Sequence, residues 1–327
     1  METDGITLPI SSTLPSDPEP WVTHGDDEMG TPRTMDSRPP LPPSVNYHLW
    51  APCNMRCRFC FAPFQDVVSQ VLPRGHLPLG EALRLVRLLA RRFEKVSFAG
   101  GEPTLCPWLP ELVAAAKAEG ATTMLVTNGS RLAQSIGRLQ PALDWVTLSI
   151  DSASTHTLLT LGRAVQGKTA LAPEQYIELA TLVRRAGMRL KVNTVVTSLN
   201  WSEDLAPLIQ SLHPERWKLL RVLPVEGQNS GSVEPLLCTD GQFAAFVQRH
   251  SVLTAEGIET VPEDNDDMRG SYAMVDPAGR FFDNASGGHR YTAPILREGI
   301  DEAWAQATFF MDRFDARGGR YEWGGDR

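Results

Sequence analysis

From residue 45 onward, short apolar runs alternate with segments of helical periodicity, and this alternation limits the folds that the chain can adopt. Six runs rich in Val, Thr and Leu predict strands, and most of the intervals between them predict helices. The predicted strands are residues 45–52, 95–100, 122–128, 145–151, 190–197 and 217–224. The predicted helices are residues 79–93, 108–120, 131–139, 173–187 and 202–212. Strands joined through helices pair in parallel, so we predict an α/β fold, a partial (β/α)6 barrel with functional groups on the loops that follow its strands.

Two parts of the chain do not follow this alternation. Residues 1–44 hold nine of the 25 prolines, and their eight acidic residues against two arginines account for −6 of the net charge of −8. We predict a disordered tail there, the barrel over residues 45–239, and an extension over residues 240–327 that covers one end of the barrel. Within the extension, residues 272–283 predict a hairpin, and residues 298–311 predict a helix.

Composition excludes several classes of protein. None of the apolar runs in the 327 residues approaches the roughly 18 residues that a membrane helix needs. The N-terminus lacks the basic and then apolar pattern of a signal peptide. The five cysteines are an odd number, and three lie in one short loop, which indicates a reduced, cytoplasmic chain without disulfides. The acidic balance argues against direct nucleic-acid binding by the chain as a whole.

Three cysteines, Cys53, Cys57 and Cys60, follow the first predicted strand at the spacing C-x3-C-x2-C. Thiolates suit zinc, copper(I) and iron–sulfur clusters. Three thiolates do not complete a tetrahedral structural site, whereas on a cube of four irons they leave one iron open to another ligand. The alternative is a zinc site with a fourth ligand, for which the candidates are His48, His76 and Cys106.

This spacing, with an aromatic residue beside the last cysteine, resembles the signature of the radical S-adenosylmethionine (SAM) enzymes. In that superfamily the open iron of a [4Fe-4S] cluster binds SAM, and one electron then cleaves SAM to methionine and a 5′-deoxyadenosyl radical. The resemblance implies both cofactors and a reductant protein of the flavodoxin or ferredoxin type. Residues 97–103, SFAGGEP, resemble the stretch that holds the SAM amine, where Glu102 could pair with the ammonium group. The implied SAM-binding residues are Phe61, Gly100, Gly101, Glu102, Asn128, Ser130 and Ser149.

Cations and amides recur at two-residue spacing in the predicted strands, which places each pair on one face of its strand. The pairs are Asn46 with His48, Lys95 with Ser97, Lys191 with Asn193, and Arg216 with Lys218. Buried cations are costly unless they are paired, so an anion with several charges, such as a triphosphate, would satisfy them. The alternative for each cation is a strand-end residue that reaches water or pairs with a carboxylate.

More specific segments resemble the viperin-like radical SAM enzymes: HPERWK (213–218), VEGQN (225–229) and GSYAMVDPAGRF (270–281). That family converts a nucleoside triphosphate to its 3′-deoxy-3′,4′-didehydro form, which terminates viral RNA chains. The resemblance implies triphosphate contacts from Lys95, Lys191, Arg216 and Lys218, ribose contacts from Asn46 and Asn193, and assistance at the sugar from Tyr272. It also implies that the extension closes the nucleotide site.

The resemblance leaves the nucleobase open. The loop FFDNASGGHRY (281–291) is less basic than its animal counterpart, so CTP and UTP are both favoured and GTP stays in consideration. One alternative function is a radical SAM enzyme that acts on another phosphorylated nucleotide or sugar. A second, from another class, is a zinc-stabilised nucleic-acid-binding module.

Overall fold

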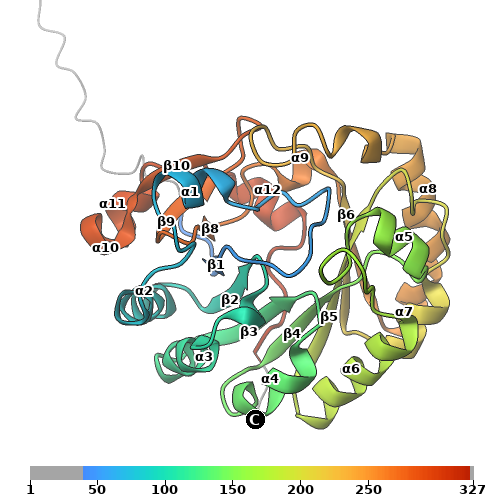
Figure 1. Cartoon of the computed structure of the whole chain (residues 1–327), viewed down its shortest axis with the longest axis horizontal. Helices are drawn as coiled ribbons and strands as arrows, with labels where there is room; N and C mark the ends of the chain where they lie inside the picture. Colours follow the sequence, from blue (N-terminus) through green and yellow to red (C-terminus); the bar gives the residue numbers. More distant parts are fainter. Residues whose placement is uncertain (1–39, 325–327) are drawn as a thin grey trace, which may run out of the picture. The chain divides into compact units, whose positions relative to one another are not determined.

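A single mixed sheet organises the computed structural model, and its central part is the parallel barrel that the sequence predicts (Figure 1). The structure describes residues 40–324, which belong to one compact unit beginning at Arg38. Most of the tail predicted over residues 1–44 therefore lies outside the described residues. The strand order is β10-β9-β8-β1-β2-β3-β4-β5-β6-β7. Pairing is parallel from β8 through to β7, whereas β9 pairs antiparallel with β8 and β10.

All six predicted barrel strands are present, which confirms the predicted fold class. They are β1 (Ser44–Trp50), β2 (Lys95–Gly100), β3 (Thr122–Thr127), β4 (Trp145–Ser149), β5 (Arg189–Val196) and β6 (Arg216–Arg221). The helices that lie between them are α1 (Gln65–Gln70), α2 (Leu79–Arg92), α3 (Leu109–Ala118), α4 (Leu132–Leu139), α5 (Thr155–Thr160), α6 (Pro173–Arg185) and α7 (Ala206–Leu212). A 3-10 helix, η1 (Pro103–Leu105), follows β2.

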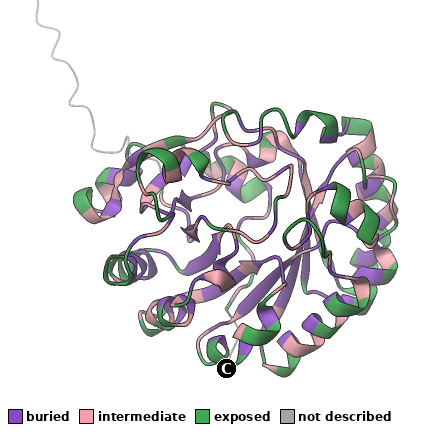
Figure 2. Ribbon diagram, in the orientation of Figure 1, coloured by how far each residue is buried: buried purple, intermediate pink, exposed green. Residues whose placement is uncertain are grey.

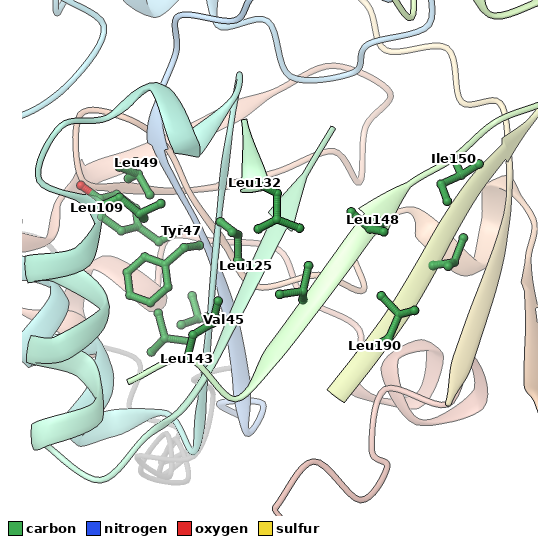
Figure 3. Close-up of a cluster of buried hydrophobic side chains, with 14 of the residues drawn as sticks. Val45, Tyr47, Leu49, Leu109, Leu125, Leu132, Leu143, Leu148, Ile150 and Leu190 are labelled. Carbon is green, nitrogen blue, oxygen red and sulfur yellow. The ribbon is translucent and has the colours of Figure 1, made fainter. Parts of the chain in front are cut away.

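Side chains of each barrel strand alternate between a helix-facing core and the barrel lumen. On β1, Val45, Tyr47 and Leu49 belong to the core, which also contains residues of the surrounding helices (Figure 3). Asn46 and His48, on the opposite face, line a cavity. Burial of one Leu or Val side chain contributes about 1.5–3 kcal/mol, so the outer faces of the strands fix which side chains face the lumen. The strands are buried and the helices turn their exposed sides outward (Figure 2).

The residues after 239 extend the sheet at both of its edges. On one side β7 (Glu259–Glu263) pairs with β6, and on the other β8 (Met274–Val275) pairs with β1. The strand β7 was not predicted, because Pro262 interrupts a run that is otherwise compatible with a strand. Proline has no backbone N–H to donate, and β7 lies at the edge of the sheet. An edge strand tolerates a proline because only one of its sides pairs with another strand.

The predicted hairpin is confirmed, since β8 and β9 (Arg280–Asp283) are joined through Asp276, whose carboxylate accepts from Ala278 N and Arg280 N. The predicted helix over residues 298–311 is wrong. Gly299, with a φ of 88°, separates two short helices there. The remaining elements are η2 (Glu234–Leu236), α8 (Asp240–His250), η3 (Ser251–Glu256), α9 (Asn265–Met268), β10 (Arg290–Pro294), α10 (Ile295–Glu298), α11 (Ile300–Trp304) and α12 (Met311–Ala316).

No helix within residues 40–324 has both the length and the apolar character that crossing a membrane requires.

Candidate active site in the barrel lumen

A cavity of about 660 Å³ occupies the barrel lumen, and its two ends differ in chemistry. At the carboxyl ends of the strands it is lined by Cys53, Cys57 and Cys60, and at the opposite end mainly by cations. The predicted site residues that line it are Asn46, Cys53, Cys57, Cys60, Phe61, Lys95, Gly100, Gly101, Asn128, Ser149, Lys191, Asn193, Lys218 and Tyr272. The predicted site residues that do not line it are Glu102, Ser130 and Arg216.

The cysteine loop is attached to the loop after β3 through Asn54. The Asn54 amide donates to Ser130 Oγ at 2.9 Å, and its side-chain oxygen accepts from Asn128 Nδ2 at 2.9 Å. Ser130, predicted as a SAM contact, therefore uses its hydroxyl to hold the cysteine loop. The side chain of Asn128 lies at the cavity wall with a partner already in place.

The loop after α5 supports the cysteine loop from the other side. Arg56 N donates to Gly162 O at 3.2 Å, and Arg58 N donates to Leu161 O at 2.9 Å. Gly162 has a φ of +77°, and a Cβ atom built on it would lie 2.1 Å from Arg56 O. Only glycine therefore allows the two loops to come this close.

We predict that Gly162→Ala weakens binding of the predicted iron–sulfur cluster by the cysteine loop. The added methyl group must displace Arg56, next to Cys57, so iron content should fall several-fold after anaerobic reconstitution. The matched control is Gly167→Ala in the same loop, where φ is +70° and a Cβ atom meets nothing within 4 Å. Both variants carry the same backbone strain, of about 1 kcal/mol. Equal iron content in the two variants would contradict the prediction.

The two glycines after β2 let this strand end pack on the cysteine loop. Gly101 N donates to Trp50 O at 2.6 Å, and Glu102 N donates to Pro52 O at 3.0 Å. A Cβ atom on Gly101 would lie 2.3 Å from Ala51 O, so no larger residue fits there without movement. The backbone of Gly100 and Gly101 consequently forms cavity wall beside the thiols.

The Glu102 carboxylate is held by groups at the ends of β2 and β3, and its predicted pairing with the SAM ammonium group stays a prediction. It is fully buried and accepts from Thr104 N at 3.1 Å, from the hydroxyls of Thr104 and Thr127 at 2.5 Å and 2.7 Å, and from Asn128 N at 2.8 Å. Burial raises its pKa, and these donors oppose the rise. Glu102 thus joins the ends of β2 and β3 as an acceptor for four donors. The sequence could not distinguish a carboxylate that accepts from these donors from one that pairs with the SAM ammonium group. Each of these roles needs a carboxylate after the two glycines.

Replacement of Glu102 by Gln separates a role in joining the two strand ends from the predicted SAM contact. The amide would present N–H groups to at least one buried donor, so we expect the free energy of unfolding to fall by about 1–3 kcal/mol. A carboxylate that bound SAM in an open cavity would instead give a variant of unchanged stability and weakened SAM affinity. Thermal unfolding and SAM titration, both on the cluster-free chain and the reconstituted protein, separate the two outcomes.

Four buried cations line the opposite end of the cavity. Lys95, Lys191, Lys218 and Arg317 expose only 5%, 7%, 4% and 6% of their surface. Burial lowers the pKa of Lys95 and Lys191 well below the ordinary lysine value, and the neighbouring cations lower it further. Lys191 has no hydrogen-bond or ion-pair partner among the described residues. Buried positive charges are costly without counter-charges, so this group of cations favours the binding of an anionic ligand.

One carboxylate, Glu263 on β7, lies among these cations. It is fully buried, pairs with Lys218 and Arg317, and accepts from the hydroxyl of Tyr272. Burial alone would raise the pKa of Glu263, but the two cations lower it to about 2, so it is ionised at neutral pH. Burial, together with the positive charges of Arg317 and Arg216, lowers the pKa of Lys218 to about 8. The pairing with Glu263 acts in the opposite direction and raises it.

Tyr272 and Arg317 are fixed against each other at this point. The guanidinium carbon of Arg317 lies 3.6 Å from the centroid of the Tyr272 ring, and the same guanidinium donates to Ser271 O at 2.7 Å. The Tyr272 hydroxyl also accepts from Lys218 Nζ at 3.1 Å. Burial raises the pKa of Tyr272 well above its ordinary value, so this hydroxyl keeps its proton.

The C-terminal segment closes the cationic end across the starts of the strands. Lys95 Nζ donates to the Tyr321 hydroxyl at 2.8 Å and lies 4.1 Å from the centroid of the Trp323 ring. The Trp145 ring nitrogen, at the start of β4, donates to Trp323 O at 3.0 Å. The segment therefore covers this end of the cavity through aromatic rings that contact cations.

Arg216 lies behind this segment and is not among the residues that line the cavity, so its predicted triphosphate contact stays a prediction. Its guanidinium pairs with Glu259, donates to Gly318 O at 2.7 Å and lies 4.2 Å from the Tyr321 ring centroid. Arg216 pairs with the carboxylate of Glu259, and Lys218 pairs with that of Glu263 while it also lines the cavity. Pairing with a carboxylate was the alternative that the sequence offered for these cations. Arg216 supports the segment that covers the cavity, and Arg317 occupies a cationic position that the sequence did not identify.

Comparison with known proteins agrees with this geometry. Residues 50–208 match the family model of the radical SAM superfamily. The chain is 50% identical over 86% of its length to an S-adenosylmethionine-dependent nucleotide dehydratase of Lacinutrix mariniflava, of which it spans 59%. It is 46% identical over 86% of its length to a protein of the same name from Flammeovirga pacifica, of which it spans 96%. The chain belongs to the radical SAM family of S-adenosylmethionine-dependent nucleotide dehydratases.

The solved structures support the fold of this radical SAM family member. The Streptococcus suis protein SuiB bound to S-adenosylmethionine superposes with a TM-score of 0.58 over 73% of this chain and 59% of its own, at 18% identity. Radical SAM proteins use a [4Fe-4S] cluster and SAM, and the thiols of Cys53, Cys57 and Cys60 suit such a cluster as a donor set. Burial raises the pKa of all three, that of Cys57 to about 12, so in the metal-free chain they are protonated thiols.

Two of the three candidate fourth ligands for zinc, the alternative from the sequence, lie against aromatic rings. The His48 ring packs edge-on against Phe61 and Phe64, and the His76 ring stacks on Trp50 at 4.2 Å. Within residues 40–324, no three His, Cys, Asp or Glu side chains are arranged to hold a single metal ion. The family membership sets the zinc-binding module aside.

Sequence reasoning missed Glu263, Arg317 and Tyr321 as residues of this site. Glu263 lies in a strand that was not predicted, and Arg317 and Tyr321 lie in the Gly-rich C-terminal segment. The one available signal was the stretch RGGRYEW (317–323), which resembles the viperin-like enzymes as a segment.

Proposed function

We propose that the chain removes water from the ribose of a nucleoside triphosphate and releases the 3′-deoxy-3′,4′-didehydro nucleotide. CTP or UTP is the favoured substrate, and GTP is a further candidate. The observation that carries this proposal is a single cavity with three thiols at one end and four buried cations at the other. The similarity to S-adenosylmethionine-dependent nucleotide dehydratases supports the same reaction class.

The thiol end suits the cofactors. When bound there, the cluster and SAM supply one-electron chemistry that generates a carbon radical able to take the 4′ hydrogen of the ribose. Cys53, Cys57 and Cys60 would hold the cluster, and the backbone at Gly100 and Gly101 would allow close approach of SAM. Ser149 lies on the same wall, and within the described residues its hydroxyl has no hydrogen-bond partner. It is therefore available to SAM.

The cationic end suits the triphosphate. Lys95, Lys191 and Lys218 can each donate to phosphate oxygens, and charge-assisted hydrogen bonds of this kind are stronger than neutral ones. Arg317 adds a fourth positive charge. Glu263 pairs with both Lys218 and Arg317, so one carboxylate balances only part of the positive charge of the four cations. A bound triphosphate would supply further negative charge.

Between the two ends, the polar groups suit a ribose. The side-chain oxygen of Asn193 is buried without a hydrogen-bond partner, and Asn193 pairs in register with Ser149 on one side and Lys218 on the other. We assign it, with Asn46, to the ribose hydroxyls. The 3′ hydroxyl needs a proton to leave as water, and Tyr272, hydrogen-bonded to Lys218 and Glu263, is suited to relay one. One further electron from the reductant would then complete the didehydro product.

The product would have no 3′ hydroxyl, so a polymerase could not extend a chain that ends with it. We therefore propose a role in defence against viruses or phages. The reaction would also need a reductant protein, and we propose one of the flavodoxin or ferredoxin type.

The experiment that tests the function is anaerobic. The reconstituted protein receives SAM and dithionite together with CTP, UTP, GTP or ATP in separate reactions, and mass spectrometry reads the products. We expect one triphosphate to lose water in step with 5′-deoxyadenosine release. An intact cluster that gives no 5′-deoxyadenosine above the substrate-free background with any triphosphate would overturn the proposal. Turnover with a nucleoside diphosphate or a sugar phosphate alone would favour the alternative substrate class.

A further inference from the structure

Three segments form one surface around the cysteine loop, which we call the cysteine-loop face: residues 51–64, 127–140 and 152–170. Asn54 connects all three. Its side chain bonds to the second segment through Ser130 and Asn128, and its carbonyl oxygen accepts from Gln166 N of the third at 2.8 Å. Two further backbone hydrogen bonds, from Arg56 and Arg58, join the first and third segments. The three segments are therefore one continuous structure.

The cysteine-loop face contains cations but no acidic residues. None of the residues of the three segments is Asp or Glu, although the chain as a whole has a net charge of −8. Its basic residues are Arg56, Arg58, Arg131, Arg138, Arg163 and Lys168. Arg163 is buried, and Arg138 pairs with Glu111 of α3 at 3.7 Å. Two carboxylates border the third segment: Asp151 pairs with the buried Arg163 at 2.5 Å, and Glu203 accepts from Ser152 Oγ at 2.6 Å.

Four of these cations have no ion-pair partner among residues 40–324. Arg56, Arg131 and Lys168 are exposed, and Arg58 is half-buried. Arg56 and Arg58 donate only to backbone oxygens: those of Cys53 and Met55, and that of Thr160. A group of unpaired positive charges without carboxylates among them attracts and orients a partner of opposite charge.

The position of the charges indicates what this partner does. Arg56 and Arg58 are the chain neighbours of Cys57, so any protein that contacts their side chains approaches the cluster-binding thiols. The proposed reaction needs one electron at that place to cleave SAM, besides the electron that completes the product. Electron-transfer partners form small and short-lived interfaces, in which complementary charge accelerates and orients the encounter.

We propose that the cysteine-loop face is the docking surface for an acidic one-electron carrier of the flavodoxin type. This inference rests on the proposed function, because it assumes a cluster at the three cysteines. In the transfer itself, one electron leaves the reduced flavin and enters the cluster, no bond forms or breaks, and no proton moves. Arg56, Arg58, Arg131 and Lys168 attract and orient the carrier.

Direct binding tests the surface without the loaded enzyme. An oxidised bacterial flavodoxin is titrated into the cluster-free chain by calorimetry, at low and at moderate salt. For the double variant Arg131→Glu, Lys168→Glu, we expect affinity to fall about tenfold or more, and the salt dependence to become shallower. The control is Arg84→Glu on the exposed side of α2, which makes a charge reversal distant from the cysteine loop and should bind flavodoxin as the parent chain does. Equal weakening by Arg84→Glu would show that net charge alone determines binding and would overturn the proposal.

Kinetics separates this proposal from the proposed function. With dithionite as reductant, the double variant should release 5′-deoxyadenosine as fast as the parent protein, because dithionite does not need the surface. With flavodoxin and its reductase, the concentration of flavodoxin for half-maximal rate should rise about tenfold. Unchanged flavodoxin dependence would overturn the docking surface, whereas loss of triphosphate-dependent turnover in the parent protein with dithionite would overturn the proposed function. Strong binding of single-stranded nucleic acid to the same face, with flavodoxin binding unaffected by the double variant, would also overturn it.

Discussion

Replacement of Lys191 by Met should make the protein more stable and much less able to use its triphosphate. Lys191 is buried, lines the cavity and has no ion-pair or hydrogen-bond partner among the described residues. Met fills a similar volume without a charge, so we expect the free energy of unfolding to rise by about 1–4 kcal/mol. For a domain of this size the melting temperature would rise by roughly 2–4 °C per kcal/mol. Loss of one charge-assisted contact to phosphate should raise KM about 10- to 100-fold.

The pH dependence of this stabilisation gives an internal check. Burial lowers the pKa of Lys191 well below the value of 10.5 that it has in the unfolded chain. At low pH the folded protein must hold a buried charge, whereas near pH 10.5 the lysine becomes neutral in both states. The advantage of Lys191→Met should therefore be largest at neutral pH and below, and should shrink as the pH rises. Both proteins contain the same buried cysteines and tyrosines. Their contributions therefore cancel in the difference between the unfolding free energies of the parent and the variant.

Lys218→Met is the matched comparison. Lys218 pairs with Glu263, so its removal leaves this fully buried carboxylate with Arg317 alone. We expect a loss of about 3 kcal/mol, opposite in sign to the effect at Lys191, although both variants should use the triphosphate poorly. Thermal unfolding and initial rates at several triphosphate concentrations measure the two effects. A Lys191→Met protein that is less stable than its parent would show that the lysine has a structural partner and would remove the main argument for an anion site.

Arg163→Met should cause the largest loss of stability. Arg163 Nε donates to Asp151 Oδ2 at 2.5 Å, both side chains are buried, and Arg163 lies near the thiol of Cys57. Removal of the arginine leaves the buried Asp151 carboxylate without its counter-charge, which typically costs about 3–5 kcal/mol. Because Asp151 Oδ1 also accepts from Val195 N at 2.8 Å, the disturbance should extend to β5.

A double variant separates the loss of a charge partner from the loss of packing. Asp151→Asn removes the unpaired charge while the amide oxygen can still accept from Val195 N. The combination with Arg163→Met should recover at least half of the lost unfolding free energy in chemical denaturation. If the double variant is no more stable than Arg163→Met alone, the arginine acts through packing on Phe59, whose ring centroid lies 5.5 Å from its guanidinium, and the ion-pair argument fails.

The sequence predicts the barrel well because its signals are local. Alternation on β1 and β5 separates core residues such as Val45 and Leu190 from lumen residues such as Asn46 and Lys191, and a strand needs only its own residues to show this pattern. The cysteine spacing likewise lies within one loop. These features predict the fold class, the thiol end of the cavity, and three of the four lumen cations.

The sequence did not predict the surroundings of side chains whose direction depends on distant parts of the chain. Glu102 faces the end of β3 because Thr127 and Asn128 offer donors there, and this requires knowledge of how two strand ends meet. Arg216 is withdrawn from the cavity by Glu259 and Gly318, which come from two segments of the extension. Arg317 enters the cavity only because the C-terminal segment crosses the starts of the strands. No local pattern could have indicated these placements.

The arrangement of the extension has a consequence for the order in which the protein can mature. Residues made after the six barrel strands provide the neighbours of both β1 and β6, so a nascent chain that has completed six strands still has two open sheet edges. Open edges of this kind pair readily with other chains. The same incomplete chain already contains the whole cysteine loop and its supporting loops. Loading of iron and sulfide can thus precede closure of the nucleotide end, and the pairing of β7 and β8 is the step that protects both edges.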